Sequence, residues 1–478
     1  MRQKPPQIFD RDREWQALAR FVAAPGPQLG IVSGRRRQGK TFLLAGLMRQ
    51  TGGFYFGATE ATEADALRRF GEALARFSDD PVMPNFRDWG EAITSMFQVA
   101  SKGSPMVIDE FPYLSRVSPE LPSLLQTEFD QAVYDNRSAS LLLCGSAMSV
   151  MGSLLSGNAP LRGRATLELV VQPFTYRTAA EFWGISDARL AVMVHAIVGG
   201  TPAYRRFVGG DVPHDEDDFD HWVKRTVLNP ETPLFREARY VLEEGTDVRD
   251  AAIYHSLLAA IAMGNHARGG IATYVGRKAS DLGHHLNVLE DCGLIRREPD
   301  VFHANRSRYV VAEPLVAFYQ AVMRPEWGLL ESGFCDNVWE NNRQVFFAQV
   351  LGPHFEGMCR QFVTSTPGMF DDLPGEVGAG TVVDRATHEQ IQIDVAVLGP
   401  QRPDRRRRVL ALGEAKWGKR LGQRQLDRLR RARDVLAARG YDAEGARLML
   451  FSGKGFDEGL AASSAEQLMT VGPDRLYG

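Results

Sequence analysis

The chain has 478 residues, which is too long for one hydrophobic core, so about three domains are expected. Apolar residues make up 44% and charged residues 24%, an ordinary globular balance, and no apolar run approaches the ~18 residues of a membrane span. The four cysteines are scattered without a C-x-x-C pair, and the N-terminus leads into charged residues. These features predict a cytoplasmic protein with reduced thiols and argue against a membrane partner.

The net charge of −3 is unevenly distributed. Residues 401–440 carry fourteen lysines and arginines against four aspartates and glutamates. A basic block on an otherwise acidic chain predicts a polyanion partner, DNA in particular. A solvated, arginine-rich helix is the alternative.

A helix is predicted from residue 8 through Phe21, and Asp10 and Arg11 stand at its start. A charged pair just upstream of a phosphate-binding loop is often where the adenine edge is held. Asp10 alternatively serves as a helix N-cap.

A phosphate-binding loop follows, with the spacing G-x-x-x-x-G-K-T. Its members are Gly34, Gly39, Lys40 and Thr41. Two glycines let consecutive backbone N–H groups point at a phosphate, Lys40 supplies a charge to it, and the Thr41 hydroxyl is a ligand for Mg²⁺. The expected strand 28–33 before the loop and helix 42–50 after it are the required context, so ATP and Mg²⁺ are predicted over a structural glycine-rich turn.

The second nucleotide signature is the apolar strand Met106–Ile108 followed by Asp109 and Glu110. Asp109 would hold Mg²⁺, mainly through water, and Glu110 would polarise the attacking water. An acidic pair of this kind favours hydrolysis over binding alone. The alternative is an exposed acidic turn.

A third strand, 140–145, ends at Ser146, which is placed to sense the γ-phosphate. The loop after it contains Arg162 and Arg164. Either arginine could reach a phosphate in its own chain or across the interface of a homo-oligomer. A pair of surface arginines fits the same pattern equally well.

A helix-turn-helix plan with a two-stranded wing is expected in the middle of the chain. Its parts are the helix 251–263, the short segment 271–278, a helix from Ser280 with Leu282, Leu286 and Leu289 inward, and the strands 293–297 and 307–311. The outer face would contain His284, His285 and Asn287, with Arg277, Lys278, Arg296 and Arg297 nearby. Contact with DNA and a plain packing role remain open for this face.

A second chemical constellation begins after Leu330, with Glu356 in a predicted helix 346–363. Residues 390–397 alternate with period two, which would put Ile391, Ile393, Val395 and Val397 on one side and Gln392 and Asp394 on the other. The next strand, 409–416, ends in Glu414-Ala-Lys416, whose two charged side chains share a face.

Asp394 and Glu414 at the end of a hairpin could chelate Mg²⁺, and Lys416 would orient the water that attacks a phosphodiester. The arginines 405–408 and 428–433 are expected nearby, on the backbone phosphates. An E-x-K triplet alone is weak evidence, because exposed strands often carry such pairs.

The order of these motifs resembles the archaeal-type AAA+ ATPases whose C-terminal domain looks like a PD-(D/E)xK nuclease. The resemblance rests on Asp10-Arg11, Gly34 to Thr41, Asp109-Glu110, Gly145-Ser146, Pro160 to Arg164, Gly199 to Tyr204, and Asp394 with Glu414-Ala-Lys416. It implies an α/β fold: a parallel AAA+ sheet (1–175), a helical lid (176–240), a winged helix (241–328) and a restriction-endonuclease-like domain (329–478). The loop departs from the family pattern in its three consecutive arginines, 35–37.

Two functions follow as expectations. One is an ATP-hydrolysing, Mg²⁺-dependent DNA nuclease. The other is an ATP-switched DNA-binding or signalling regulator whose C-terminal domain does not cut. The retained Asp394, Glu414 and Lys416 favour the nuclease.

Overall fold

The computed structural model describes residues 3–100, 104–245, 251–384, 387–403, 405–461 and 468–478. The chain forms two compact units, Met1–Pro173 and Phe174–Gly478. Among the described helices, none is long and apolar enough to cross a membrane.

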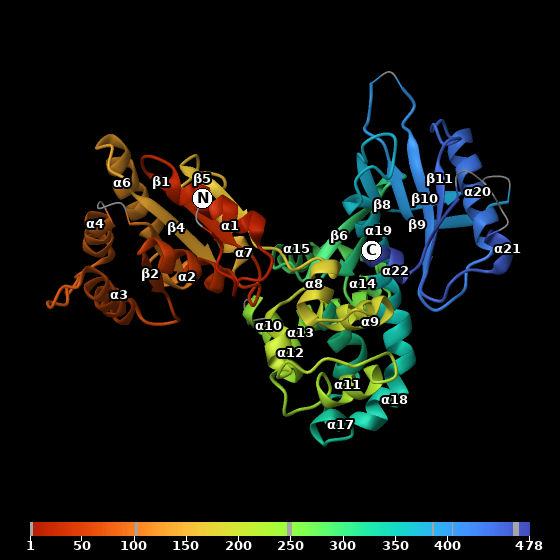
Figure 1. Cartoon of the computed structure of the whole chain (residues 1–478), viewed down its shortest axis with the longest axis horizontal. Helices are drawn as coiled ribbons and strands as arrows, with labels where there is room; N and C mark the ends of the chain where they lie inside the picture. Colours follow the sequence, from red (N-terminus) through yellow and green to blue (C-terminus); the bar gives the residue numbers. More distant parts are fainter. Residues whose placement is uncertain (1–2, 101–103, 246–250, 385–386, 404, 462–467) are drawn as a thin grey trace. The chain divides into compact units, whose positions relative to one another are not determined.

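The first unit is a sheet of five parallel strands in the order β2-β3-β4-β1-β5, with helices on both faces (Figure 1). Its strands are β1 (Gln28–Ser33), β2 (Phe54–Gly57), β3 (Met106–Asp109), β4 (Ser140–Gly145) and β5 (Ala165–Val170). Its helices are α1 (Asp12–Ala23), α2 (Lys40–Thr51), α3 (Glu63–Ser78), α4 (Trp89–Ala100), α5 (Phe111–Val117), α6 (Leu121–Tyr134) and α7 (Met148–Ser153).

Alternation along the buried strands divides the core of this unit in two. Ile31 and Ile108 face a cluster that contains α3, α4, α5 and α6. Their neighbours Val32 and Val107 face the opposite cluster, formed with α1 and α2. Strands that are apolar on both sides are typical of a parallel sheet covered by helices on both faces. The predicted strands 28–33, 106–109 and 140–145 are confirmed, and the helix after the phosphate loop begins at Lys40, two residues earlier than expected.

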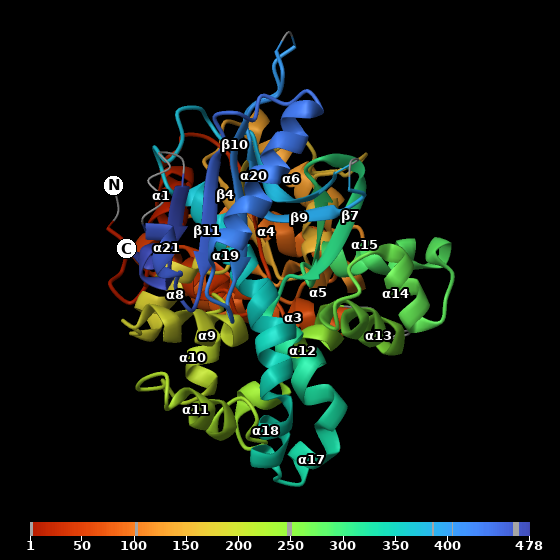
Figure 2. The same cartoon turned by 90° about the vertical axis from the view of Figure 1, so that its right-hand side faces the viewer.

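The second unit contains most of the helices. They are α8 (Tyr176–Trp183), α9 (Ala188–Val198), α10 (Ala203–Phe207), α11 (Phe219–Arg225), α12 (Pro233–Gly245), α13 (Ala251–Ala262), α14 (Arg268–Val275), α15 (Gly283–Asp291), α16 (Pro314–Phe318), α17 (Trp327–Glu331), α18 (Cys335–Val345), α19 (Gly352–Ser365), α20 (Gln423–Ala438), α21 (Glu458–Ala461) and α22 (Pro473–Tyr477). In Figure 2, α11, α17 and α18 lie together at the end of the unit away from the strands, and α18 contacts both of the others.

The strands of the second unit form a hairpin and a mixed sheet of order β12-β11-β10-β9-β8. They are β6 (Ile295–Asp300), β7 (His303–Val311), β8 (Glu376–Val383), β9 (Gln390–Leu398), β10 (Val409–Lys416), β11 (Arg447–Ser452) and β12 (Leu468–Val471). Strands β8, β9 and β10 are antiparallel, whereas β11 and β12 run parallel to β10. Helices α19 and α20 cover opposite faces of this sheet (Figure 1).

The predicted helices and two-stranded wing in the middle of the chain are confirmed as α13, α14, α15 and the β6–β7 hairpin. Leu282, Leu286 and Leu289 are buried as expected. His285 is not fully on the outer face, because its ring lies 5.6 Å from that of Tyr254.

The tip of the β6–β7 hairpin packs on β8, the edge strand of the mixed sheet. The backbone N–H of Val301 donates to the carbonyl of Ala379 at 3.2 Å, and the N–H of Thr381 donates to Asp300 at 3.0 Å. A Cβ at Gly380 would meet Phe302 at 2.4 Å, so only glycine allows this close approach. The hairpin therefore covers an edge that would otherwise be open.

The helix expected over 346–363 is confirmed: it begins with a π-helical turn, Phe346–Leu351, and continues as α19. The alternation expected over residues 390–397 is wrong. Along β9 the alternation breaks, because Gly378 pairs with Ala396 whereas Gly380 pairs with Ile393. One extra residue therefore bulges from β9 at Asp394–Val395, which turns Val395 and Val397 to the face opposite Ile391 and Ile393.

Candidate functional site

The phosphate loop connects β1 to α2 and is shaped by its two glycines. Gly34 has φ 140° and Gly39 has φ 87°, both in the region that favours glycine. A Cβ at Gly34 would also lie 2.5 Å from the carbonyl oxygen of Val171. These positions therefore require glycine, and the loop ends at the N-terminus of a helix of twelve residues.

Lys40 lies folded over this loop and is 4% exposed. Its ammonium donates hydrogen bonds to the carbonyl oxygens of Gly34 at 2.7 Å and Arg35 at 2.9 Å. Burial lowers the pKa of Lys40 below its ordinary value, although the nearby Glu110 and Asp109 oppose that change. The ammonium is thus held by weak carbonyl acceptors that a phosphate group would replace with a stronger one.

Thr41 and Asp109 meet across the loop and the end of β3. The Thr41 hydroxyl donates to Oδ2 of Asp109 at 2.7 Å, and the hydroxyl of Tyr55 on β2 donates to the same oxygen at 2.6 Å. Asp109 is only 2% exposed, so these bonds satisfy a carboxylate that water scarcely reaches. The sequence-predicted pair is brought together, whereas Tyr55 was not foreseen.

Glu110 is held by the end of the neighbouring strand β4. Its Oε2 accepts a hydrogen bond from the Ser146 hydroxyl at 2.9 Å. The Nε of Arg36, in the phosphate loop, donates to the same hydroxyl oxygen at 3.2 Å, and Arg36 also bonds the hydroxyl of Tyr113. A chain of contacts therefore joins the phosphate loop, Ser146 and Glu110, and it gives one of the three consecutive arginines a partner.

Asp10 and Arg11 differ in their surroundings. Arg11 is buried, donates to the carbonyl of Gln38 in the phosphate loop at 3.2 Å, and pairs with Glu14 at 3.1 Å. Asp10 is exposed, and α1 begins after Arg11 without a side-chain cap, so the structure does not support Asp10 as the N-cap. An adenine contact stays a prediction.

Arg162 and Arg164 are both engaged within the first unit. Arg164 makes a two-pronged ion pair with Asp130, at 2.7 Å for each contact, and Arg162 donates to the carbonyl of Gly157 at 2.6 Å. The structure does not bring either arginine to the Lys40–Asp109 group through a described contact. Their role across a subunit interface stays a prediction.

The second candidate site centres on Asp394, which lies in the bulge of β9 and is 2% exposed. Its Oδ2 accepts from the ammonium of Lys416 at 2.7 Å and from the N–H of Ala415 at 3.0 Å. Gln392 donates to Oδ1 at 3.1 Å, and Arg360 on α19 donates to the backbone carbonyl at 3.0 Å. The bulge thus aims this carboxylate toward α19 and the end of β10.

Glu356 on α19 lies close to the same group, 3.7 Å from the ammonium of Lys416. Burial, reinforced by the negative charge of Asp394, raises the pKa of Glu356 to about 7. The pKa of Lys416 is also raised: burial disfavours its ammonium, but the carboxylates of Asp394, Glu356 and Glu414 outweigh that effect.

Glu414 is next to Asp394 across the hairpin, since each lies one residue beyond the paired Gly413 and Val395. Its Oε1 is 3.6 Å from the guanidinium of Arg428 on α20. Its Oε2 is buried and has no hydrogen-bond partner among the described residues. Burial raises the pKa of Glu414, and Arg428 and Lys416 oppose that effect.

Mg²⁺ requires oxygen ligands, and the two sites differ in the oxygen atoms that they offer. Within the described part of the chain, no three histidine, cysteine, aspartate or glutamate side chains are placed to hold a metal ion. Mg²⁺ at nucleotide sites uses one or two protein oxygens together with phosphates and water, so Thr41 and Asp109 fit it. At the second site the unpartnered Oε2 of Glu414 fits a cation, whereas Lys416 neutralises Asp394.

The arginines 405–408 are not beside the second site, contrary to expectation. Leu398 pairs with Val409, so the turn between them closes the β9–β10 hairpin at the end opposite Asp394 and Glu414. A hairpin has its turn at one end only, and the acidic residues occupy the other. The arginines of α20 are mostly in ion pairs, among them Arg430 with Asp427 at 2.9 Å and Arg431 with Asp384 at 2.8 Å.

Comparisons with known proteins place the fold. No family model matches the chain. An uncharacterised protein, MJECL04 of Methanocaldococcus jannaschii, is 28% identical over 416 residues, which are 86% of this chain and 87% of that protein. The Walker-type ATPase PABY2304 of Pyrococcus abyssi matches with a TM-score of 0.53 at 20% identity, over 67% of this chain and 98% of its own. The ORC2 protein of Aeropyrum pernix, with ADPNP and ADP bound, has a TM-score of 0.46 at 14% identity, over 72% and 97%.

The chain thus shares its fold, over 67% of its length, with the Walker-type ATPase PABY2304. Beyond that fold, Tyr55, Arg36 and Gln392 are the contacts that sequence reasoning missed. The aromatic residues 54–56 favour a strand, but only the sheet order places Tyr55 beside Asp109. Arg36 is one of three consecutive arginines, and nothing in the local sequence indicates which of them bonds Ser146.

Proposed function

We propose that the chain binds and hydrolyses ATP at the phosphate loop. The observation that carries this proposal is the meeting of three strand ends: Thr41 bonds Asp109, and Glu110 bonds Ser146, at 2.7 and 2.9 Å. Parallel strands deliver ligand-binding groups at their carboxyl ends. Asp109 and Glu110 are at the end of β3, Ser146 directly follows β4, and Thr41 lies in the first turn of α2, after the loop that leaves β1.

In this proposal the loop N–H groups and Lys40 hold the phosphates, and Thr41 and Asp109 hold Mg²⁺. The metal would neutralise charge that develops on the phosphates. Glu110 accepts the proton of the attacking water, and Ser146 fixes its carboxylate. Tyr55 keeps Asp109 oriented by a hydrogen bond to the oxygen that Thr41 also contacts.

ATP binding and turnover test these roles separately. Lys40→Ala should lose ATP binding, measured with a fluorescent ATP analogue. Glu110→Gln should keep binding but lose most phosphate release. Glu120→Gln is the matched control, since Glu120 is exposed and makes no described side-chain contact. Phosphate release by Glu110→Gln at the parent rate would refute the assignment of the base.

We further propose that the second site cleaves DNA with Mg²⁺, in a restriction-endonuclease-like domain over residues 329–478. Asp394 and Glu414 lie next to each other across a bulged hairpin, and Lys416 reaches Asp394 at 2.7 Å. The two carboxylates would hold the metal, helped by the carbonyl of Ala415. Lys416 would orient the attacking water, and Glu356, with a pKa of about 7, could exchange a proton near neutral pH.

The alternative is an ATP-switched DNA-binding regulator that does not cut. It is favoured by the salt bridge of Lys416 to Asp394 and by the lack, among the described residues, of a third metal-holding side chain. In both versions α8 to α12 (176–240) would act as the lid and residues 241–328 as a winged helix. The two versions differ only in whether the second site cleaves DNA.

A cleavage assay separates the two versions. Purified protein would be incubated with plasmid, linear and single-stranded DNA, with and without Mg²⁺ and ATP. The nuclease version predicts Mg²⁺-dependent cleavage that Asp394→Asn and Lys416→Ala abolish while ATP hydrolysis persists. Lys454→Ala, at an exposed lysine, is the control. DNA binding without cleavage under every condition would select the regulator.

A further inference from the structure

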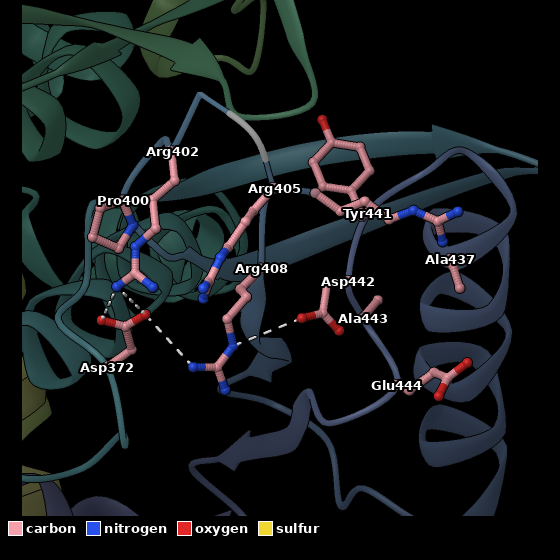
Figure 3. Close-up of a pocket in the computed structure, with 11 residues that line it drawn as sticks. Asp372, Pro400, Arg402, Arg405, Arg408, Ala437, Tyr441, Asp442, Ala443 and Glu444 are labelled. Carbon is pink, nitrogen blue, oxygen red and sulfur yellow. Dashed lines mark hydrogen bonds and ion pairs between the residues drawn. The ribbon is translucent and has the colours of Figure 1, made fainter.

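A separate cavity of about 480 Å³ lies at the turn end of the β9–β10 hairpin. Four arginines line it: Arg402, Arg405, Arg406 and Arg408. Figure 3 shows Arg402, Arg405 and Arg408 converging, with Asp372 on one side and Asp442 on the other. The size is that of a small-ligand pocket.

Two of these arginines are already neutralised. Arg402 pairs with Asp372 at 3.1 Å, and Arg408 lies 3.5 Å from Asp372 and 3.9 Å from Asp442. Arg405 and Arg406, in contrast, are exposed, and their guanidinium groups make no hydrogen bond or ion pair with any described residue. The cavity therefore contains two guanidinium groups without a described acidic partner, beside two arginines that are held in ion pairs.

The wall behind them is held in place. Arg407 pairs with Glu376 at 2.7 Å, and its carbonyl accepts from the N–H of Asp442 at 3.0 Å. The ring of Tyr441, which also lines the cavity, packs edge-on against Phe302 at 5.9 Å. A rigid wall, an aromatic ring and two free guanidinium groups together suit a phosphate group linked to a flat base.

We propose that this cavity binds a small phosphate-bearing ligand, of the nucleoside-phosphate class, through Arg405 and Arg406. Bidentate hydrogen bonds from guanidinium to phosphate are strong and directional. Asp372 and Asp442 are paired with Arg402 and Arg408, whereas Glu444 lines the same cavity without a described ion pair. Its charge would oppose a continuous polyanion that crosses the cavity, so a short ligand fits better than a nucleic-acid strand. The proposal does not depend on hydrolysis or cleavage at the other two sites.

Binding is measured by calorimetry in full-length Lys40→Ala protein, which removes the phosphate-loop site. The probes are pyrophosphate, ADP and a short single-stranded oligonucleotide. Arg405→Ala/Arg406→Ala should weaken pyrophosphate and ADP binding about tenfold or more. Arg20→Ala/Arg49→Ala removes the same charge at exposed positions and should leave binding unchanged. The four substituted arginines, Arg405, Arg406, Arg20 and Arg49, are all exposed. Unaltered melting temperatures are therefore expected and would show that the variants fold.

Tighter binding of ADP than of pyrophosphate, lost again in Tyr441→Ala, would support the role of the ring. Three results would overturn the proposal: no binding of pyrophosphate or ADP, binding that the Arg405/Arg406 variant keeps, or an effect on the oligonucleotide alone. The last result would assign the arginines to a nucleic-acid strand instead.

Discussion

At the scale of single residues, the proposed nucleotide site could be predicted because its motifs depend on local spacing. The loop from Gly34 to Thr41 and the pair Asp109-Glu110 each follow a strand that a short apolar run predicts. The partners that hold these groups were not readable. Tyr55 reaches Asp109 only because β2 and β3 are neighbours, and strand order is a property of the whole sheet.

Ser146 bonds Glu110 and accepts a hydrogen bond from Arg36 of the phosphate loop, but no described bond joins it to Lys40 or Thr41. Ser146→Ala should therefore leave ATP affinity unchanged and lower kcat about fivefold. One hydrogen bond contributes ~1 kcal/mol, and ~1.4 kcal/mol corresponds to a tenfold change in rate. Steady-state phosphate release and equilibrium ATP binding measure the two quantities. A raised Kd for ATP with kcat intact would show that Ser146 acts on binding instead.

Glu298 on the wing gives a pH-dependent contribution to stability. Burial alone would raise its pKa, but Arg360, Arg308 and Arg296 lower it to about 2. A lowered folded-state pKa stabilises the fold above the unfolded value of ~4.3, and this stabilisation is lost as pH falls toward 2. At neutral pH, Glu298→Gln should destabilise the second unit by roughly 3 kcal/mol, because Arg360 would be left buried without this partner.

Thermal melts between pH 7 and pH 3 check this prediction. The melting temperature of the parent should fall with decreasing pH more steeply than that of Glu298→Gln, and the two should approach each other at the acid end. Glu444→Gln is a control at an exposed glutamate without a described ion pair. Parallel curves for parent and Glu298→Gln would contradict the lowered pKa.

At the scale of elements, regular periodicity was predictable and its interruptions were not. The strands β9 and β10 lie within one residue of their expected bounds, 390–397 and 409–416. The bulge at Asp394–Val395 leaves no mark in the sequence, because an extra residue is defined only against the partner strand. Likewise, the arginines of α20 look like a polyanion surface until Asp384 and Glu389, from a distant loop, are seen beside Arg431.

The number of arginines in α20 predicts a strong contribution to DNA binding, whereas their ion pairs predict a small one. Neutralising Arg430, Arg431 and Arg433 should leave the slope of log K against log salt nearly unchanged, because each arginine already has an acidic partner. Neutralising Lys419 and Arg424, which are exposed and have no described ion pair, should reduce the slope by about 2.

Fluorescence anisotropy with a labelled duplex at several salt concentrations measures both slopes. The two sets of variants serve as controls for each other, since both remove positive charge near β10. A large loss of slope in the triple variant alone would show that its ion pairs open on DNA.

At the scale of the whole chain, the order of the parts stays a prediction, and the way they share cores was not predictable from the sequence. A single apolar cluster runs from Tyr176 to Leu476 and includes residues of the predicted lid, winged helix and C-terminal domain. The last helix, α22, supplies Leu476, whose carbonyl accepts hydrogen bonds from Tyr176 at 2.9 Å and Arg177 at 2.8 Å. Composition and motif spacing show where parts begin, but long-range packing decides which of them unfold together.

These cores predict two thermal transitions. The clusters of the first unit lie within residues 8–171, and those of the second lie within 176–476, so each unit should unfold cooperatively by itself. A non-hydrolysable ATP analogue at 100 times its Kd should stabilise the first unit by ~2.7 kcal/mol and raise only its transition. Leu476→Ala removes a fully buried side chain and should lower only the second transition, by ~2 to 5 kcal/mol. Differential scanning calorimetry resolves both effects, and one transition that responds to the analogue and to Leu476→Ala alike would show that the chain unfolds as a single unit.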